Sequence, residues 1–333
     1  MIIQLESNIT GQQRENLNKI LLQHGIKVKE VRTNQLDYLV SVLAKDIDIR
    51  MIGNLPGIRD VHRVDDHYKM VSRKWKVRPT SIDLGNGITI GDNDFAVIAG
   101  PCSIESEAQV HEIVAYLVKN NIRIMRGGVY KPRSSPYAFR GLGLEGLKMF
   151  HAICHANGIR IISEVMQVSQ IAEMMPYVDI FQVGSRNAQN FNLLDALGEI
   201  DKPVLLKRGI SGTINELLQS AEYVFSAGNE KIILCERGIR TFENAYRNTF
   251  DINAIPILKE KSHLPVIADP SHGIGIRKHV SKIALAAMVA GADGIMTELH
   301  YEPELAFSDG QQTLSFEEFD SLLDMVNRMK DIL

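Results

Sequence analysis

Hydrophobic and polar residues follow two different patterns along the chain, and the pattern changes near residue 70. Before that point, alternating and helical spacings predict strand, helix, strand, strand, helix and strand at 2–5, 12–24, 26–32, 38–43, 47–52 and 57–64. This βαββαβ order is typical of small ferredoxin-like domains. We therefore expect a small domain at residues 1–66.

A polar stretch from Asp65 to Pro79 follows, and we expect a linker at 67–80. The next residues, SIDLGNGITIG at 81–91, carry a turn signal between two short alternating runs and predict a β-hairpin. We expect a single large domain at 81–333.

From Phe95 onward, one unit repeats: a short apolar run, a helical stretch and another apolar run. Nearly continuous apolar strands that alternate with helices predict a parallel sheet covered by helices. Eight such units in about 240 residues favour a (β/α)₈ TIM barrel over the alternative, an open doubly wound sheet. The runs are FAVIAG, IRIMRGG, IRIISEV, VDIFQVG, PVLLKRG, KIILCERG, PVIADPSH and GIMTELH.

The composition narrows the class of protein. A chain of 333 residues with 45% hydrophobic and 23% charged residues is typical of a globular protein. No apolar run approaches the roughly 18 residues of a membrane helix, and the first residues lack the features of a signal peptide, so we expect a cytoplasmic protein. The net charge of -3 argues against nucleic acid or a membrane surface as a partner.

Charged or metal-binding residues stand at the end of almost every predicted strand. Alone, each would more often be a solvated surface group. A barrel, however, brings the carboxyl ends of its strands together at one mouth, where barrel enzymes place their chemistry. The set therefore predicts one site, and it consists of Cys102, Arg126, Lys131, Glu164, Arg186, Lys207, Arg237, His272 and Glu298.

Two chemistries divide these residues. Six cations in one cleft of a near-neutral protein imply more than one bound anionic group, and the arginine fork suits carboxylate and phosphate. One thiol, one imidazole and two carboxylates suit a divalent ion such as Mn²⁺, Fe²⁺, Co²⁺ or Zn²⁺, and we expect no organic cofactor. The cations are Arg126, Lys131, Arg133, Arg186, Lys207 and Arg237, and the metal candidates are Cys102, His272, Glu298 and Asp309.

Other motifs are weaker. Residues 141–146 match GxGxxG, but no apolar strand precedes them, so a dinucleotide site is not expected. His151 and His155 have metal-binding spacing without a third ligand nearby, which favours a helix surface. Cys154 and Cys235 fall within a helix and a strand, where we expect structural thiols.

Seven segments together resemble the 3-deoxy-D-arabino-heptulosonate 7-phosphate (DAHP) synthases, in particular the type Iβ branch with an amino-terminal ferredoxin-like domain. They cover the whole predicted barrel. The resemblance implies condensation of phosphoenolpyruvate with erythrose 4-phosphate, the first step of the shikimate pathway. The segments are AGPCS (99–103), RGGVYKPRSSPYAF (126–139), GSRNAQN (184–190), LLKRG (205–209), LCERGIRTFE (234–243), ADPSHGIG (268–275) and TELHYEPELAFSDGQQ (297–312).

The same resemblance implies roles for individual residues. It assigns Lys131, Glu164 and His272 to catalysis, with Glu164 near the reacting water. Phosphoenolpyruvate would bind through its carboxylate to Arg126, Lys131 and Lys207, and through its phosphate to Arg186 and Arg237. Erythrose 4-phosphate would bind to Pro132, Arg133, Ser134 and Asp309. The divalent metal would bind to Cys102, His272, Glu298 and Asp309.

We also expect a homo-oligomer, a tetramer. The βαββαβ plan of residues 1–66 resembles small modules that bind amino acids between subunits, so we expect regulation by phenylalanine or tyrosine through these residues, unless they only stabilise the protein or form the oligomer. Three alternatives stay open at this point. The chain could be a 3-deoxy-D-manno-octulosonate 8-phosphate (KDO8P) synthase, although Pro132 stands where that relative typically carries Ala-Asn after the lysine. Lys207 could be a Schiff-base lysine. The chain could also be a non-catalytic amino-acid sensor.

Overall fold

The computed structural model describes residues 1–43, 48–91, 95–132, 135 and 137–333. The first part folds as predicted, in the order strand, helix, strand, strand, helix, strand. Its antiparallel sheet has the strand order β2-β3-β1-β4. The elements are β1 (Ile2–Leu5), α1 (Gly11–Gln23), β2 (Lys27–Arg32), β3 (Asp37–Leu43), α2 (Ile49–Gly53) and β4 (Ile58–His62).

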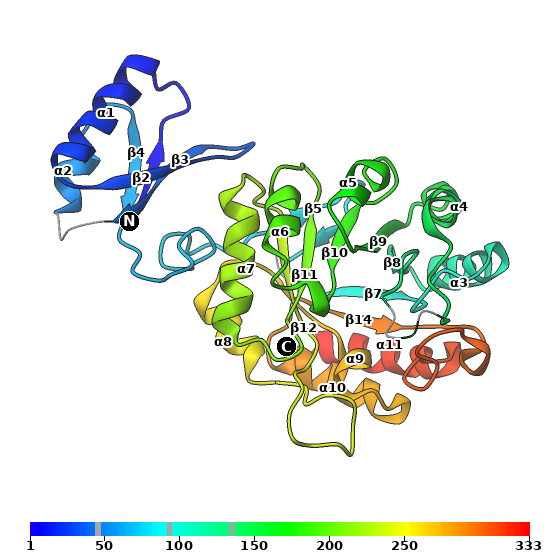
Figure 1. Ribbon diagram of the computed structural model, residues 1–333. Helices are drawn as coiled ribbons and strands as arrows, with labels where there is room; N and C mark the ends of the chain where they lie inside the picture. The colour runs from blue at the N-terminus through cyan, green and yellow to red at the C-terminus, as the bar shows by residue number, and fades with distance from the viewer. Residues whose placement is uncertain (44–47, 92–94, 133–134, 136) are drawn as a thin grey trace.

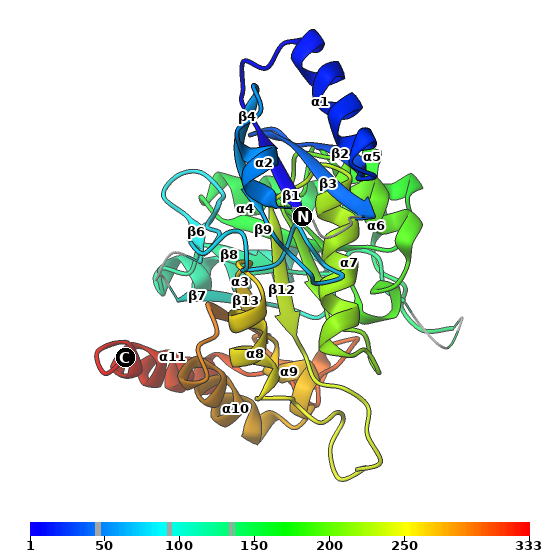
Figure 2. The same cartoon turned by 90° about the vertical axis from the view of Figure 1, so that its left-hand side faces the viewer.

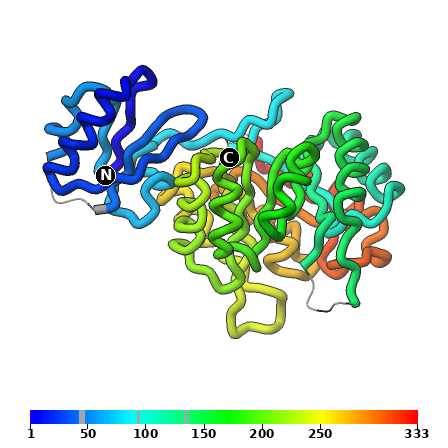
Figure 3. Tube along the Cα trace, turned by 45° about the horizontal axis from the view of Figure 1, so that its top comes forward, coloured from blue at the N-terminus to red at the C-terminus, as the bar shows by residue number. Residues whose placement is uncertain are grey.

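The two faces of this small sheet are buried against different parts of the chain. One face packs with helices α1 and α2 in a core that includes Ile3, Leu21 and Ile52. Ile2 and Tyr38, on the other face, belong to the core of the large domain. The small domain thus forms a lobe beside the barrel (Figure 1, Figure 3).

Eight parallel strands close into a barrel, so the open-sheet alternative is wrong. Strand β14 pairs with β7 over five residues and completes the ring. Every predicted apolar run contains one of the strands, which are β7 (Ala96–Gly100), β8 (Ile124–Arg126), β9 (Arg160–Val165), β10 (Ile180–Val183), β11 (Val204–Lys207), β12 (Ile232–Glu236), β13 (Val266–Ala268) and β14 (Gly294–Glu298).

Helices surround the barrel, and two views at right angles show them outside the ring of strands (Figure 1, Figure 2). A short additional helix, α9 (Pro270–Ile274), lies between β13 and the helix that covers it. The covering helices are α3 (Glu107–Lys119), α4 (Gly143–Ala156), α5 (Ser169–Met174), α6 (Phe191–Gly198), α7 (Ile214–Ser226), α8 (Ala254–Lys261), α10 (Arg277–Val289) and α11 (Phe316–Lys330).

The predicted hairpin closes the amino-terminal end of the barrel. Its strands are β5 (Ile82–Asp83) and β6 (Thr89–Ile90). Ile82, Ile88 and Ile90 join one apolar cluster with the inward-facing residues of the barrel strands. Because this end is filled with apolar side chains, polar inward positions are expected at the opposite, carboxyl end.

The segment between the two domains is anchored to the barrel, although its sequence is polar. Met70, Val71 and Ser72 are buried. The backbone N–H groups of Met70 and Val71 donate to the two carboxylate oxygens of Glu222 on α7, at 2.9 and 3.1 Å. Trp75 contributes further, because its ring meets the edge of Phe225 on the same helix.

His263 fastens the same segment from the other side. Burial, with a smaller effect of Lys76, lowers the pKa of His263 to about 3, so the ring is neutral. Its Nε2 donates to the carbonyl of Met70 at 2.9 Å, and its Nδ1 accepts from the Thr80 hydroxyl at 2.8 Å. The linker therefore has a fixed path across the barrel.

Glu222→Ala should loosen this anchor. It leaves two buried N–H groups without their acceptor, which costs about 1–3 kcal/mol. We expect faster limited proteolysis within residues 65–80, with Glu112→Ala, an exposed position on α3, as the control. Equal cleavage rates for the two variants would contradict the anchoring role of Glu222.

Candidate active site

The polar residues of the barrel mouth are placed by the alternation of side chains along each strand. Apolar residues at one level of the barrel face inward and form the floor of the mouth. Two residues further along a strand, the side chain again faces inward, now above the floor. The step leads from Ile124 to Arg126, Ile162 to Glu164, Ile180 to Gln182, Leu205 to Lys207, Cys235 to Arg237, Ile267 to Asp269 and Met296 to Glu298.

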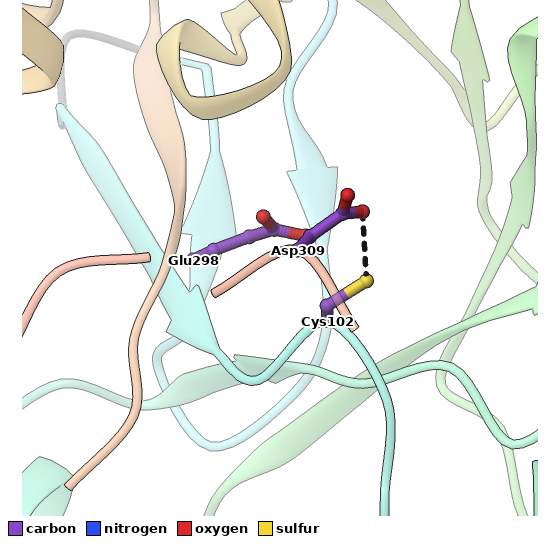
Figure 4. A group of neighbouring side chains, drawn as sticks. All are labelled: Cys102, Glu298 and Asp309. Carbon is purple, nitrogen blue, oxygen red and sulfur yellow. Dashed lines mark hydrogen bonds between the residues drawn. The ribbon is translucent and has the colours of Figure 1, made fainter. Parts of the chain in front are cut away.

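Three of the predicted metal ligands converge in the mouth. One potential ligand atom from each of Cys102, Glu298 and Asp309 lies within 4.8 Å of the others (Figure 4). The Cys102 thiol donates to Asp309 Oδ2 at 3.1 Å. Burial, followed by the charge of Glu298, raises the pKa of Cys102 to about 11, so this thiol is protonated unless a cation is bound beside it.

His272 joins this group from helix α9. Its Nε2 lies 3.3 Å from Glu298 Oε1 and 3.9 Å from Asp309 Oδ2. Its Nδ1 lies 2.8 Å from the carboxylate of Asp269, which can only accept, so Nδ1 carries the proton and the Nε2 lone pair faces the group. Sulfur, nitrogen and two carboxylates in this arrangement fit a borderline divalent ion.

Neighbouring residues hold the two carboxylates in place. Gln312 Nε2 donates to Glu298 Oε2 at 2.8 Å. Arg247 Nη1 contacts Asp309 Oδ1 at 3.1 Å. Burial alone would raise the pKa of Asp309, but Arg247 and His272 hold it well below its ordinary value. Asp309 is therefore ionised at neutral pH.

A cavity of about 210 Å³ opens beside this group. Cations form much of its wall: the predicted Lys131, Arg186, Lys207 and Arg237, together with Arg240 and Arg247. Pro132, Glu164, His272 and Asp309 also line it. So many cations around one small space suit a highly anionic ligand.

Arg126 lies deeper than the other cations and does not line the cavity. Its Nη1 donates to the carbonyl of Pro101 at 2.8 Å and to Glu298 Oε1 at 3.2 Å. The side chain is buried, and its charged partner is the candidate metal ligand Glu298 rather than a group in the cavity. Arg133 and Ser134 lie outside the described residues.

Two lysines bridge the parts of the site. Lys131 Nζ donates to the carbonyl of Cys102 at 2.8 Å and contacts its sulfur at 3.0 Å. Lys207 Nζ donates to Asp269 Oδ2 at 2.5 Å. Lys131 therefore links the cavity to the candidate metal ligand Cys102, and Lys207 links the cavity to Asp269, the partner of His272.

Glu164 faces the same cavity from β9. Gln182 Nε2 contacts its Oε2 at 3.4 Å. Gly184, just after β10, leaves room for this carboxylate, because a Cβ atom at this position would clash with Glu164 Oε1. A side chain at residue 184 would therefore require the carboxylate end of Glu164 to shift from its present position.

Sequence reasoning missed several residues of the site. Gln182 and Asp269 occupy inward positions two residues after Ile180 and Ile267, so strict counting along each strand would have found them. Arg240 and Arg247 come from the long loop between β12 and α8, which projects beyond the barrel (Figure 3). No periodic pattern places a residue of such a loop.

The two other cysteines and the histidine pair are not part of the candidate metal site. Cys154 and Cys235 are buried, and burial raises the pKa of both thiols, as expected for structural residues. His155 lies on helix α4 with its side chain 31% exposed, as predicted for a helix surface, and its Nε2 lies 2.9 Å from Asp179 Oδ2. Among the described residues, His151 and His155 belong to no group of three potential metal ligands.

Comparison with known proteins agrees with this site. The sequence pattern of the DAHP synthetase I family matches residues 76–333. The chain is 42% identical over 335 residues to the phospho-2-dehydro-3-deoxyheptonate aldolase of Thermotoga maritima, covering 100% of this chain and 98% of that protein. A 2-dehydro-3-deoxyphosphooctonate aldolase of Syntrophobacter fumaroxidans is 34% identical over 257 residues, covering 72% of this chain and 88% of the relative.

Solved structures give the same result. The crystal structure of the Thermotoga maritima aldolase, a DAHP synthase, superposes with a TM-score of 0.79 at 41% identity, covering 99% of this chain and 97% of that one. A truncated form of the Thermotoga maritima synthase gives a TM-score of 0.75 at 44% identity, covering 80% of this chain and 97% of the other. No described helix is both long and apolar enough to cross a membrane. The matched family, the full-length similarity and the barrel-mouth residues together establish that the chain belongs to the DAHP synthetase I family.

Proposed function

We propose that the chain catalyses the DAHP synthase reaction, in which phosphoenolpyruvate, erythrose 4-phosphate and water give DAHP and phosphate. One observation carries the proposal: thiol, imidazole and carboxylate side chains lie together beside a cavity walled by cations. The reaction needs both features, since it joins two phosphorylated anions through an aldehyde. In the first step, C3 of phosphoenolpyruvate attacks the aldehyde carbon.

The cations bring the two anions together. We assign Arg186 and Arg237 to the phosphate of phosphoenolpyruvate, and Lys131 and Lys207 to its carboxylate, because all four line the cavity. Arg126 does not line the cavity, so it would act on the bound anion only indirectly, through its contact with Glu298. Two anions repel each other in water. A preorganised cationic wall lowers the activation barrier because it holds the two anions in position and compensates their charges.

Cys102, His272, Glu298 and Asp309 would hold the divalent ion. When bound, the ion supplies Lewis acidity to the aldehyde oxygen. Of these four side chains, His272 and Asp309 line the cavity, so the aldehyde oxygen of erythrose 4-phosphate would be oriented toward them and its phosphate away from them. Pro132, which lines the cavity, bounds the space for the sugar chain.

Lys131 and Glu164 would manage the protons. Lys131 Nζ lies 3.0 Å from Cys102 Sγ, close enough to the ligand group to donate a proton to the oxygen that becomes a hydroxyl. Glu164 would hold the water that adds at C2. Phosphate then leaves from the resulting hemiketal, and Arg186 and Arg237 compensate its charge.

The small domain would regulate the enzyme in response to phenylalanine or tyrosine. Its support is the contact with α7: Tyr38 of the small domain packs edge-on against Phe225. The loop that precedes α7 carries Ile210, which lines the cavity. An effector that binds one arrangement of the domain better than another could therefore change the site.

We also propose a homotetramer. Aromatic side chains on loops at the barrel mouth are exposed, among them Tyr137 at 96% and Phe242 at 99%. Large aromatic side chains with this much exposed surface favour burial against another protein surface. Partner subunits would cover them.

Removal of metal should abolish activity, and Mn²⁺ should restore it. Cys102→Ala should weaken Mn²⁺ binding by more than the roughly 10–100-fold that loss of an outer hydrogen-bond partner costs, because it removes a ligand. Mn²⁺ affinity is measured by competition with a fluorescent chelator, with Cys154→Ala as the control. Full activity after chelation would exclude the metal role.

Erythrose 4-phosphate should be the preferred aldose phosphate. We expect its kcat/KM to exceed that of arabinose 5-phosphate by at least about 10-fold, because Pro132 bounds the cavity for the shorter chain. Phosphate release with each sugar measures the ratio. Equal or faster turnover of arabinose 5-phosphate would favour the KDO8P synthase alternative.

Removal of the small domain should leave catalysis and eliminate inhibition by aromatic amino acids. The truncated chain should begin at Asp65, because residues 70–72 are buried against the barrel. Initial rates with and without phenylalanine or tyrosine are compared for the full and truncated chains. Indifference of the full chain, or equal inhibition of both chains, would contradict regulation by residues 1–66.

A further inference from the structure

Asp269 lies between the metal-ligand group and the cationic wall, and it contacts one residue of each. Its Oδ2 accepts from Lys207 Nζ at 2.5 Å and lies 2.8 Å from His272 Nδ1. Its Oδ1 accepts from the backbone N–H of His272 at 3.0 Å. The side chain is 1% exposed, so solvent does not compete for these partners.

The contact with His272 directs a candidate metal ligand. As an acceptor, the carboxylate keeps the proton on Nδ1 and turns Nε2 toward Glu298, 3.3 Å away. A carboxylate in this position also makes the imidazole a stronger donor to a metal ion. The negative charge that Asp269 presents to His272 therefore affects the metal affinity of the group.

The contact with Lys207 makes that charge depend on the contents of the cavity. Lys207 shares Oδ2 with His272, and it also lines the cavity. An anion in the cavity competes with Asp269 for the ammonium group. When it draws Nζ away, Asp269 is less neutralised and acts more strongly on His272.

We propose that Asp269 is a positioning residue that couples anion binding to metal binding. The anion strengthens the metal site through Lys207 and Asp269, and by linkage the bound ion strengthens anion binding by the same factor. The inference rests on the proposed function, since it takes His272 as a metal ligand and Lys207 as a ligand of phosphoenolpyruvate. It adds Asp269, a residue that would contact neither the metal ion nor phosphoenolpyruvate.

The test measures Mn²⁺ affinity of the metal-free full-length protein, with and without phosphoenolpyruvate, by competition with a fluorescent chelator. Asp269→Asn keeps the shape of the side chain and removes its charge. We expect a loss of Mn²⁺ affinity of roughly 10–100-fold. We also expect the tightening of Mn²⁺ binding by phosphoenolpyruvate to be strongly reduced.

Asp179→Asn is the matched control. Asp179 also accepts from a histidine and from a backbone N–H, at 2.9 and 2.8 Å, but it lies at the start of β10, away from the mouth. This variant should retain the wild-type Mn²⁺ affinity and the wild-type response to phosphoenolpyruvate. A general loss of rigidity on removing a partly buried carboxylate would instead affect both variants.

Lys207→Met tests the coupling from the other side and keeps Asp269 bonded to His272. Without phosphoenolpyruvate, it should bind Mn²⁺ at least as tightly as the wild type, because Asp269 is no longer neutralised by the ammonium group. The response to phosphoenolpyruvate should again be reduced. This arm remains decisive if Asp269→Asn does not fold, as judged by thermal unfolding.

Two results would overturn the inference. One is an Mn²⁺ affinity that contradicts the role of this carboxylate: wild-type affinity in Asp269→Asn, or a clear loss of affinity in Lys207→Met. The other is an undiminished response to phosphoenolpyruvate in both variants. Turnover is measured separately: a wild-type protein that shows the coupling but does not consume erythrose 4-phosphate would contradict the proposed function and leave the coupling intact.

Discussion

The site depends on the pairing of buried charges. An unpaired charge inside a protein costs several kcal/mol, so carboxylates beside the most deeply buried cations of the barrel mouth stabilise them there. Arg126 pairs with Glu298, and Lys207 pairs with Asp269. Loss of one partner therefore leaves the charge of the other buried and uncompensated, so the charged residues of the site depend on one another.

The barrel wall carries a second network that faces away from the cavity. Arg208 Nη1 donates to Glu236 Oε2 at 2.8 Å and to Asp251 Oδ2 at 2.9 Å. Lys207 and Arg237 are the chain neighbours of this pair and face inward. The outward ion pair therefore joins the ends of β11 and β12. It offsets the repulsion between the two inward cations, which would otherwise push these strand ends apart.

The closed floor and the anchored linker have related effects. The hairpin isoleucines fill the amino-terminal end, so the charges of the mouth stand above an apolar base and interact in a low dielectric. On the outside, Glu222 and His263 hold the linker against the barrel. A motion of the small domain would thus be passed to α7 through fixed contacts.

The sequence by itself determined the order of the elements, the eight strands and most of the cavity wall, because these follow from local periodicity and from the ends of strands. Strict alternation would also have yielded Gln182 and Asp269. Only the tertiary structure decided that Arg126 turns to Glu298, that Arg247 reaches Asp309 from a distant loop, and that a polar linker is anchored by Glu222. These contacts join residues far apart in the chain, and their energy depends on distance and burial in three dimensions, which no pattern along one strand or helix contains.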